Sequence, residues 1–370
     1  MAAETIEESN LAGIGSDMDK ELRKAAAESE EEFAGAGSEV GLEIWRIEKF
    51  EPVKVRDEKE HGIFYMGDAY IVLHTYTAED SDTLKWDLHF WLGKDSTQDE
   101  QGSAAYLTVN LDDMLSGTPV QYREVDGAES KLFLSYFSQL MKVEGGVASG
   151  FTSPEPETYE TKLLHVSGTG TDVVVQQVPI DVSSLNNKDV FILDLGMKLY
   201  QFNSVNCGPF ERMAGSGVLE KIVALRNYEP EGINIDGEEV LEIEEFWAPF
   251  GGVVELSELP DPPEPEEEEE SGIRKLYKVS DEDGSIGCDL VEEKDGENLS
   301  LSLIEEDSIM IAVANNEALF YIGSGASQGE RFHMNFKTAE ILETIGLPWN
   351  ARVTQVKKDG DTSKWDELFS

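Results

Sequence analysis

The sequence contains few cysteines and no long apolar run. Its two cysteines, Cys207 and Cys288, cannot form a framework of disulfides, and no Cys/His cluster has the spacing of a zinc site. No segment approaches the ~20 apolar residues of a membrane-spanning helix. The N-terminal MAAETIEESN has neither the basic nor the apolar region of a secretion signal. These absences predict a protein of the reducing cytoplasm.

Basic residues are also scarce, because 29 Lys and Arg stand against 76 Asp and Glu, for a formal net charge of -47. Nucleic acids and anionic membranes are recognised by Lys/Arg patches, so neither is expected as a partner. Clustered carboxylates instead favour hard divalent cations such as Ca2+, which prefer oxygen ligands. Because charges of one sign repel one another within a compact fold, bound calcium would relieve part of that repulsion.

Catalytic motifs are missing as well. The sequence has none of the glycine-rich phosphate loops and no G-x-S-x-G elbow. Its five histidines form no pair at i,i+4 spacing, and no nucleophile with a neighbouring base can be nominated. The stretch 281–284 resembles the start of an EF-hand loop but lacks the downstream ligands. The sequence therefore predicts a protein that is not an enzyme.

What the sequence does contain is one order of elements repeated three times. In each copy a buried strand is followed by a second strand and then a helix. The predicted strands are 42–47, 64–74 and 84–92, then 188–194 and 198–202, then 306–312 and 318–323, and the predicted helices are 99–117, 131–141, 210–226 and 330–345. The copies recur at a spacing of ~120 residues, which indicates tandem domains because solenoid units are much shorter.

The expected fold class is α/β (α+β), with three tandem domains that each have a central mixed sheet flanked by a long and a short helix. The domains are expected at 39–144, 161–258 and 273–370. The acidic N-terminal extension, 1–38, is either a mobile tail or, over 19–33, a solvated helix. The linkers are 145–160 and the acidic, proline-rich 259–272, which prolines and like charges keep extended.

Paired acidic residues occur at the same place in each copy. An Asp stands at the entry of the apolar strand and a Glu at the start of the helix, as Asp68 and Glu100, Asp189 and Glu211, and Asp307 and Glu330. Two such carboxylates can converge on one Ca2+, and a backbone carbonyl such as that of Gly67 would add a neutral oxygen. The alternative is that they are ordinary surface carboxylates or helix N-terminal charges.

The predicted helix 99–117 has two apolar faces. One stripe has the i, i+3, i+4, i+7 spacing of a core-facing surface and consists of Ala104, Leu107, Leu111, Met114 and Leu115. The second face carries Ala105, Tyr106 and Val109, followed by Asn110 and Asp113. This second face predicts either insertion of the helix into a groove of a partner or burial on both sides within its own protein.

Several motifs resemble the gelsolin/villin superfamily, and the three-repeat length is most similar to its severin and fragmin members. These motifs are FYMGDAYIVLHTY, WDLHFWLGKDSTQDEQGSAA, LDDMLSG, REVDGAES and GGVASGF in the first copy, NNKDVFILDLG and FERM in the second, and KLYKVS with the Glu306-Asp307 strand in the third. The resemblance covers nearly all of 41–370. It implies calcium-dependent severing of actin filaments and capping of their fast-growing ends, with the long helix of the first domain inserted between actin subdomains.

The resemblance also implies site residues. It implies that four residues of this chain contact actin: Tyr106, Val109, Asn110 and Asp113. It assigns Ca2+ in the first domain to Gly67, Asp68, Glu100 and the carbonyl of Val147, and an ion shared with an actin carboxylate to Asp112 and the carbonyls of Gly117 and Pro119. In the second domain it indicates Lys188 through its carbonyl, Asp189, Glu211 and Asp236, and in the third Glu306 through its carbonyl, Asp307, Glu330 and Asp361.

One segment departs from the family pattern. Between the first two domains the family is usually basic, but 141–177 contains only Lys142 and Lys162 against five acidic residues. Phosphoinositide binding is therefore not supported, and side-binding to filaments by the second domain is weakened. The hypotheses are a severing and capping protein, a capping or monomer-binding protein without severing, and an acidic calcium-buffering protein. The free chain is expected to be a monomer in the cytoplasm and on the cytoskeleton.

Overall fold

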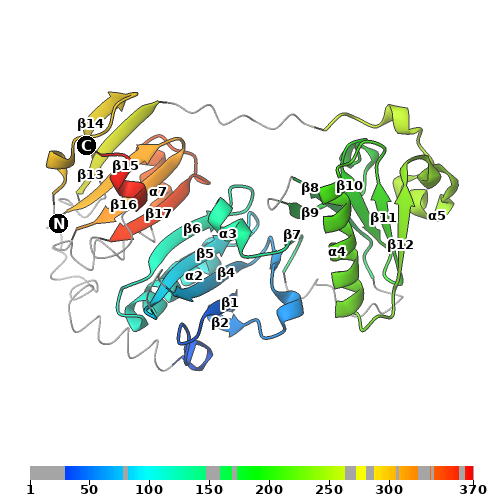
Figure 1. Ribbon diagram of the computed structural model, residues 1–370, viewed down its shortest axis with the longest axis horizontal. Helices are drawn as coiled ribbons and strands as arrows, with labels where there is room; N and C mark the ends of the chain where they lie inside the picture. The colour runs from blue at the N-terminus through cyan, green and yellow to red at the C-terminus, as the bar shows by residue number, and fades with distance from the viewer. Residues whose placement is uncertain are drawn as a thin grey trace, which may run out of the picture. The chain divides into compact units, whose positions relative to one another are not determined.

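The computed structural model (Figure 1) describes residues 30–77, 82–146, 159–168, 173–262, 272–280, 287–305, 308–323, 334, 337–357 and 363–369. They form two compact units. The first unit comprises the described parts of Met1–Lys54, Ala69–Ser130 and Glu267–Ser370. The second unit comprises those of Val55–Asp68 and Lys131–Glu266.

The first unit is built on a ten-stranded mixed sheet with the order β14-β13-β15-β16-β17-β6-β5-β4-β1-β2. Its strands are β1 Gly41–Glu48, β2 Glu51–Lys54, β4 Ala69–Thr77, β5 Leu84–Leu92, β6 Val120–Val125, β13 Ile273–Ser280, β14 Gly287–Asp295, β15 Ile309–Ala314, β16 Glu317–Ile322 and β17 Arg352–Lys357. Its helices are α2 Gln98–Met114, α7 Thr338–Thr344 and α8 Ser363–Asp366, with short 3-10 turns at η2 Glu31–Phe33 and η9 Leu301–Leu303.

The second unit has a seven-stranded mixed sheet with the order β12-β11-β10-β8-β9-β7-β3. Its strands are β3 Ile63–Tyr65, β7 Leu140–Val143, β8 Lys162–Ser167, β9 Val174–Val178, β10 Val190–Asp194, β11 Lys198–Asn203 and β12 Glu231–Asp236. Its helices are α3 Lys131–Ser135, α4 Pro209–Leu225 and α5 Glu244–Trp247, and its 3-10 turns are η3 Glu58–Glu60, η5 Val182–Ser184, η6 Gly237–Glu242, η7 Ala248–Phe250 and η8 Leu256–Glu258.

The same strand pattern occurs three times, as the sequence predicts. Two antiparallel pairs are followed by one parallel pair in β1-β4-β5-β6, in β8-β10-β11-β12 and in β13-β15-β16-β17. A parallel neighbour requires a crossover connection, and the helix supplies it each time, as α2, α4 or α7. In the first unit the first and third copies share one sheet, because β6 pairs antiparallel with β17 over three residue pairs.

The core of the first copy lies between its sheet and α2. The predicted inner stripe of the helix is confirmed, because Ala104, Leu107 and Leu111 are buried with the apolar residues of β1, β4 and β5. Phe33 and Ala36 belong to the same cluster, and the Phe33 ring meets Trp45 edge to face at 5.3 Å. The end of the acidic extension, at Phe33 and Ala36, is therefore anchored in the core, and most of the helix predicted over 19–33 lies outside the described residues.

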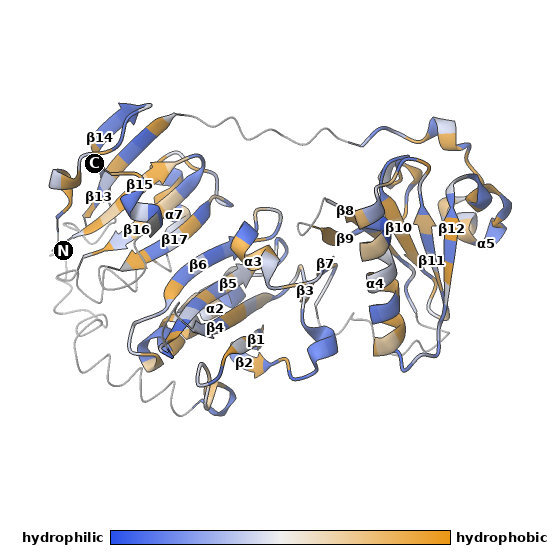
Figure 2. Cartoon of the chain, viewed as in Figure 1, coloured by the Kyte–Doolittle hydropathy of each residue, from blue (hydrophilic) through white to orange (hydrophobic). Residues whose placement is uncertain are grey.

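In the second unit α4 lies along the face of β8, β10, β11 and β12 (Figure 1). Its apolar and polar residues alternate in bands along the helix (Figure 2). A separate aromatic cluster packs at α5, where Phe246 and Trp247 are fully buried beside the ring of Phe202. The strand β10 is buried along its whole length, as expected for a strand between two apolar layers.

Two predicted elements are wrong. The expected strand 64–74 is interrupted at Met66–Asp68, where the Gly67 N–H donates to the Gly145 carbonyl at 2.8 Å, and β3 and β4 consequently lie in different sheets. The expected helix 131–141 ends at Ser135, and the chain continues as β7 paired with β3. The rings of Phe64, Phe133 and Phe137 pack edge to face around this point. The helix therefore ends where these rings pack together, and helical periodicity in the sequence does not reveal such a contact.

The helix predicted over 330–345 in the third copy is described from Thr338, and 324–333 lie outside the described residues.

The REVDGAES motif closes a buried polar network in the first copy. The Glu124 carboxylate lies 2.9 Å from His89 Nδ1 and accepts hydrogen bonds from the N–H and hydroxyl of Ser130, both at 2.7 Å. His89 and Glu124 are essentially inaccessible to solvent. Burial acts to raise the pKa of Glu124, but the hydrogen bond and charge of His89 and the two bonds from Ser130 outweigh it, so the pKa lies below its ordinary value.

We expect Glu124→Gln to make the protein less stable by about 1.5–3 kcal/mol at neutral pH, the range for hydrogen bonds to a charged group. A carboxylate with a depressed folded-state pKa stabilises the fold above its unfolded pKa of about 4.3 and loses that contribution as the pH falls. The difference between wild type and variant should therefore be full above about pH 5 and shrink below about pH 4. Urea unfolding at a series of pH values measures it, and a pH-independent difference would contradict the role of the charge.

Candidate functional site

Both ends of α2 are fixed by local interactions. Thr97 and Glu100 form a capping box, in which the Thr97 side chain accepts from the Glu100 N–H and the Glu100 carboxylate accepts from the Thr97 N–H at 2.9 Å. At the other end Ser116 and Gly117 have left-handed φ values of 64° and 69°. The Gly117 N–H donates to the Asp112 carbonyl at 2.8 Å. This wrapping bond brings the Asp112 and Gly117 backbones into one turn.

The outer face of α2 is partly open. Tyr106 is 37% exposed and Val109 is half-buried, whereas Asn110 and Asp113 are only 3% and 9% exposed. The four residues predicted to contact a partner therefore divide into two accessible apolar groups and two buried polar ones in this conformation. Ala105, the remaining member of this face, is buried.

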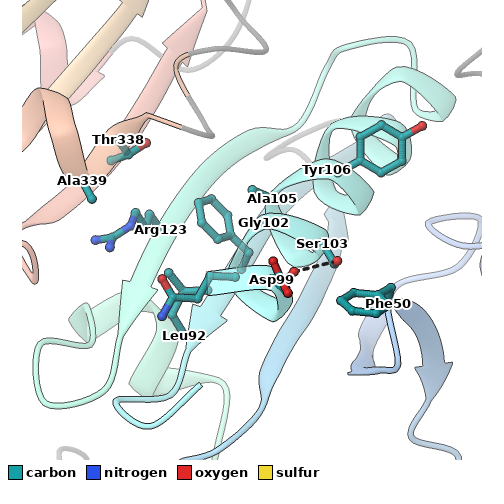
Figure 3. Close-up of a pocket in the computed structure, with 12 residues that line it drawn as sticks. Phe50, Leu92, Asp99, Gly102, Ser103, Ala105, Tyr106, Arg123, Thr338 and Ala339 are labelled. Carbon is teal, nitrogen blue, oxygen red and sulfur yellow. Dashed lines mark hydrogen bonds between the residues drawn. The ribbon is translucent and has the colours of Figure 1, made fainter. Parts of the chain in front are cut away.

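A cavity of about 900 Å3 adjoins the helix (Figure 3). Its walls come from the N-terminal half of α2, from β5 and β6 and from the start of α7. The residues that line it are Phe50, Phe90, Leu92, Asp99, Gln101, Gly102, Ser103, Ala105, Tyr106, Arg123, Thr338 and Ala339. The cavity thus touches the same outer face that carries Tyr106.

The predicted shared calcium site lies at the C-terminal end of α2. The structure brings Asp112 and Gly117 together in the turn described above, and Pro119 is buried two residues further on. The C-terminal end of a helix carries the negative end of its dipole, which favours a cation there. The side chain of Asp112, which is 6% exposed, and the carbonyls of this turn are oxygen donors of the kind that Ca2+ takes.

The first predicted Asp…Glu site is described in part. The Asp68 carboxylate lies against Gly146, because a Cβ built on Gly146 would come within 2.8 Å of Asp68 Oδ1. A Cβ on Gly67 would likewise meet the Gly145 carbonyl oxygen at 2.8 Å. Glycines are therefore required on both sides of this close approach. Val147, the next predicted ligand, lies outside the described residues, and Glu100 is engaged in the capping box of α2.

In the second copy the two predicted carboxylates do meet. Asp189 Oδ2 lies 2.7 Å from His165 Nε2 and accepts from the Asn186 amide at 2.7 Å. Burial acts to raise the pKa of Asp189, but these two hydrogen bonds lower it overall. Burial raises the pKa of Glu211, to which the charge of Asp189 adds, although the Gly208 N–H donates to it at 2.7 Å. The negative charge of each carboxylate makes ionisation of the other less favourable. A divalent cation bound between them would stabilise both in the ionised form, with their oxygens as its ligands.

The other predicted ligands differ in outcome. Lys188 precedes Asp189 in the chain, and its N–H donates a hydrogen bond to Asn186 Oδ1 at 2.8 Å. Asp236 instead pairs with Arg212 and Asn203, at 3.1 and 3.0 Å. The ligands predicted in the third copy lie outside the described residues; they are Glu306, Asp307, Glu330 and Asp361. Among the residues that the structure describes, no group of three or more His, Cys, Asp or Glu side chains is arranged to hold a metal.

A buried ion pair in the second copy was not predicted from the sequence. Arg226 donates to both oxygens of Asp194, at 2.5 and 2.9 Å, and also to the Tyr159 hydroxyl and the Gly196 carbonyl. Both charged side chains have no solvent exposure. The bonds tie the end of α4 to the end of β10 and to the segment before β8. The only signal in the sequence was a charged residue at the end of each element.

These features define a protein built from repeats of one mixed-sheet strand pattern, with a capped helix whose outer face carries an accessible tyrosine. None of the described helices has the length and apolarity needed to cross a membrane. The Gelsolin repeat family matches residues 51–134 and 171–239.

Relatives match nearly the whole chain. It is 36% identical to Gelsolin-like protein 2 of Lumbricus terrestris, over 91% of this chain and 90% of that protein. It is 35% identical to Severin of Echinococcus granulosus, over 92% of this chain and 91% of that protein. The chain therefore belongs to the gelsolin/villin superfamily.

A solved structure, the complex of Thorarchaeota 2DGel3 with rabbit actin, covers 56% of this chain and 98% of that one at 24% identity, with a TM-score of 0.24. At this TM-score the likeness supports no inference about the shape or partners of this chain.

Proposed function

We propose that this chain binds actin and, when Ca2+ is present, severs actin filaments and caps their fast-growing ends. The observation that carries the proposal is the outer face of α2, on which Tyr106 and Val109 remain accessible although the inner stripe already fills the core. A helix with a second apolar face of this kind fits a groove on a partner. The match to Severin over nearly the full length of both chains supports the choice of partner.

Three tandem domains at 39–144, 161–258 and 273–370 are part of the proposal, and the threefold strand pattern supports them. The burial of Asn110 and Asp113 supports a calcium-controlled change, since the polar part of the outer face of α2 is covered in this conformation while Tyr106 is accessible. The pairing of β6 with β17 joins the first and third copies through only three residue pairs. We propose that calcium binding separates these strands and uncovers the helix.

The calcium ligands of the proposal are those of the sequence analysis. The residues of the second copy fit the ion, because the carboxylates of Asp189 and Glu211 lie close enough to interact, and Lys188 directly precedes Asp189 in the chain. At the end of α2 the ion would lie beside Asp112 and supply positive charge between this acidic chain and an actin carboxylate. The residues of the chain would hold and orient the ion, and the apolar face of α2 would supply the contact area.

Capping or monomer binding without severing is the second candidate. One observation favours it, because Lys142 and Lys162 are 3% and 6% exposed, so neither basic side chain between the first two domains is available to a filament side or a phosphoinositide headgroup. An acidic calcium-buffering protein that engages no filament is the remaining alternative.

Microscopy of fluorescent actin filaments tests these functions. In micromolar calcium we expect breaks along filaments within seconds to minutes after the chain is added, followed by ends that neither grow nor shorten. Without calcium the filaments should stay intact. Stable ends without breaks would favour capping alone, and unchanged filaments in both conditions would contradict the actin proposal.

A further inference from the structure

Arg123 has no counter-ion among the residues that the structure describes. It lies on β6, in register with Phe90 of β5 and Val353 of β17. The residue is only 6% exposed, and within the described part of the chain its guanidinium makes no ion pair, while the buried Nη1 atom has no hydrogen-bond partner. Burial alone lowers its pKa to about 10, so the group is still charged at neutral pH. A buried cation is costly unless an anion pairs with it.

The contrast with Arg226 shows that this chain pairs a buried arginine elsewhere. Arg226 has a bidentate carboxylate partner, whereas Arg123 has none among the described residues, although the sequence holds 76 Asp and Glu. Arg123 lines the cavity beside α2 (Figure 3). Its guanidinium points toward the side of the cavity formed by Thr338 and Ala339 (Figure 3).

The cavity has the composition of a small-molecule site. Its volume of about 900 Å3 lies within the range of roughly 300–1,000 Å3 that is common for ligand pockets. Phe90, Leu92 and Ala105 supply apolar walls, and among the described residues that line it Arg123 is the only basic one. Asp99, exposed at the start of α2, is the only acidic residue in this described lining.

We propose that this cavity binds a small organic monocarboxylate with an apolar body. The carboxylate pairs side-on with the guanidinium of Arg123, whose planar fork matches two carboxylate oxygens. The body lies against Phe90 and Ala105. A phosphate dianion fits less well, because one guanidinium would leave it with excess negative charge beside Asp99 in an already acidic protein. This binding does not depend on the actin proposal.

Because of where the cavity lies, a bound ligand would affect both the stability of the first unit and the outer face of α2. Its walls include both α2 and α7, so an occupant contacts the first and third copies at once and stabilises the first unit by mass action. Tyr106 also lines it, so an occupant covers part of the face proposed for actin.

Isothermal titration calorimetry of the full chain, without actin, tests the proposal. The probe is 3-phenylpropanoate, and the matched control ligand is 3-phenylpropanamide, which has the same body without the charge. We expect the carboxylate to bind at least tenfold more tightly than the amide and at least tenfold more tightly than acetate, which lacks the body. Inorganic phosphate should bind more weakly than the carboxylate. Equal affinity for carboxylate and amide, or preference for phosphate, would overturn the proposal.

Variants assign the effect to Arg123. Arg123→Gln should abolish the preference for the carboxylate over the amide, and removal of a buried unpaired cation should leave the fold intact by circular dichroism. Arg123→Lys keeps the charge but loses the fork, so the preference should fall at least threefold without vanishing, and this variant serves if Arg123→Gln fails to fold. Arg274→Gln, an arginine on β13 that bonds Asn298 instead, should bind as wild type. An unchanged preference in Arg123→Gln would show that another group recognises the acid.

Discussion

Replacing Asp194 with alanine should lower the free energy of unfolding of the second unit by about 3–5 kcal/mol, the usual cost of removing one partner of a buried ion pair. The variant leaves Arg226 fully buried without its two charge-assisted bonds. The Tyr159 hydroxyl also loses its acceptor, to which it donates at 2.5 Å. Burial, and then the charge of Asp194, raise the pKa of Tyr159, so that hydroxyl stays a neutral donor. Urea unfolding followed by circular dichroism measures the loss.

Two further variants separate the buried pair from ion pairing in general. Lys198 and Glu245 form an exposed pair in the same unit, with 41% and 49% of their side chains accessible. Lys198→Gln leaves the bond from the Tyr200 hydroxyl to Glu245 in place and should change the stability little, because water and salt screen the ion pair. The double variant Asp194→Leu with Arg226→Met should recover much of the loss, since it removes both buried charges together. A loss in Asp194→Ala no larger than in Lys198→Gln would contradict the role of burial.

The sequence predicts most of the fold because its strands and long helices have clear periodicity and end signals. The strand at 84–92 matches β5 residue for residue, and the N-cap Thr97 and the left-handed Gly117 bracket α2. The failures occur where tertiary contacts decide. Gly67 ends a strand because of its hydrogen bond to Gly145, which lies far along the chain, and Phe33 enters the core by packing on Trp45. Neither contact leaves a local pattern.

The candidate site divides in the same way. The meeting of Asp189 with Glu211 follows from the repeat, because a strand entry and a helix start recur in fixed register. The approach of His165 to that pair, and the pairing of Asp194 with Arg226, depend on strand order, which spacing in one sequence does not reveal. Arg123 is part of a family motif, yet its isolation from every described carboxylate is visible only in three dimensions.

The second prediction with a large effect concerns Asp112. If an ion at the end of α2 joins this chain to an actin carboxylate, Asp112→Ala should weaken actin binding at least tenfold in saturating calcium, which is about 1.4 kcal/mol. The loss should be within about twofold in chelator, because the bridging ion is then absent from wild type as well. The turn itself should survive, since the bond from Gly117 uses the backbone carbonyl of Asp112 and not its side chain. Titration of pyrene-labelled actin over a series of free calcium concentrations measures both values.

Tyr106→Ala is the matched variant for this test, because it removes apolar contact area from the same helix without removing a calcium ligand. Tyr106 is accessible, so its replacement should not disturb the core of the first copy. We expect it to weaken actin binding at every calcium concentration while the calcium midpoint of binding stays where it is in wild type. Asp112→Ala should instead shift that midpoint to higher calcium. Equal losses of actin affinity for Asp112→Ala with and without calcium would show that the acidic side chain contacts actin directly. That result would contradict the proposal of a bridging ion but would leave the proposed contact between α2 and actin intact.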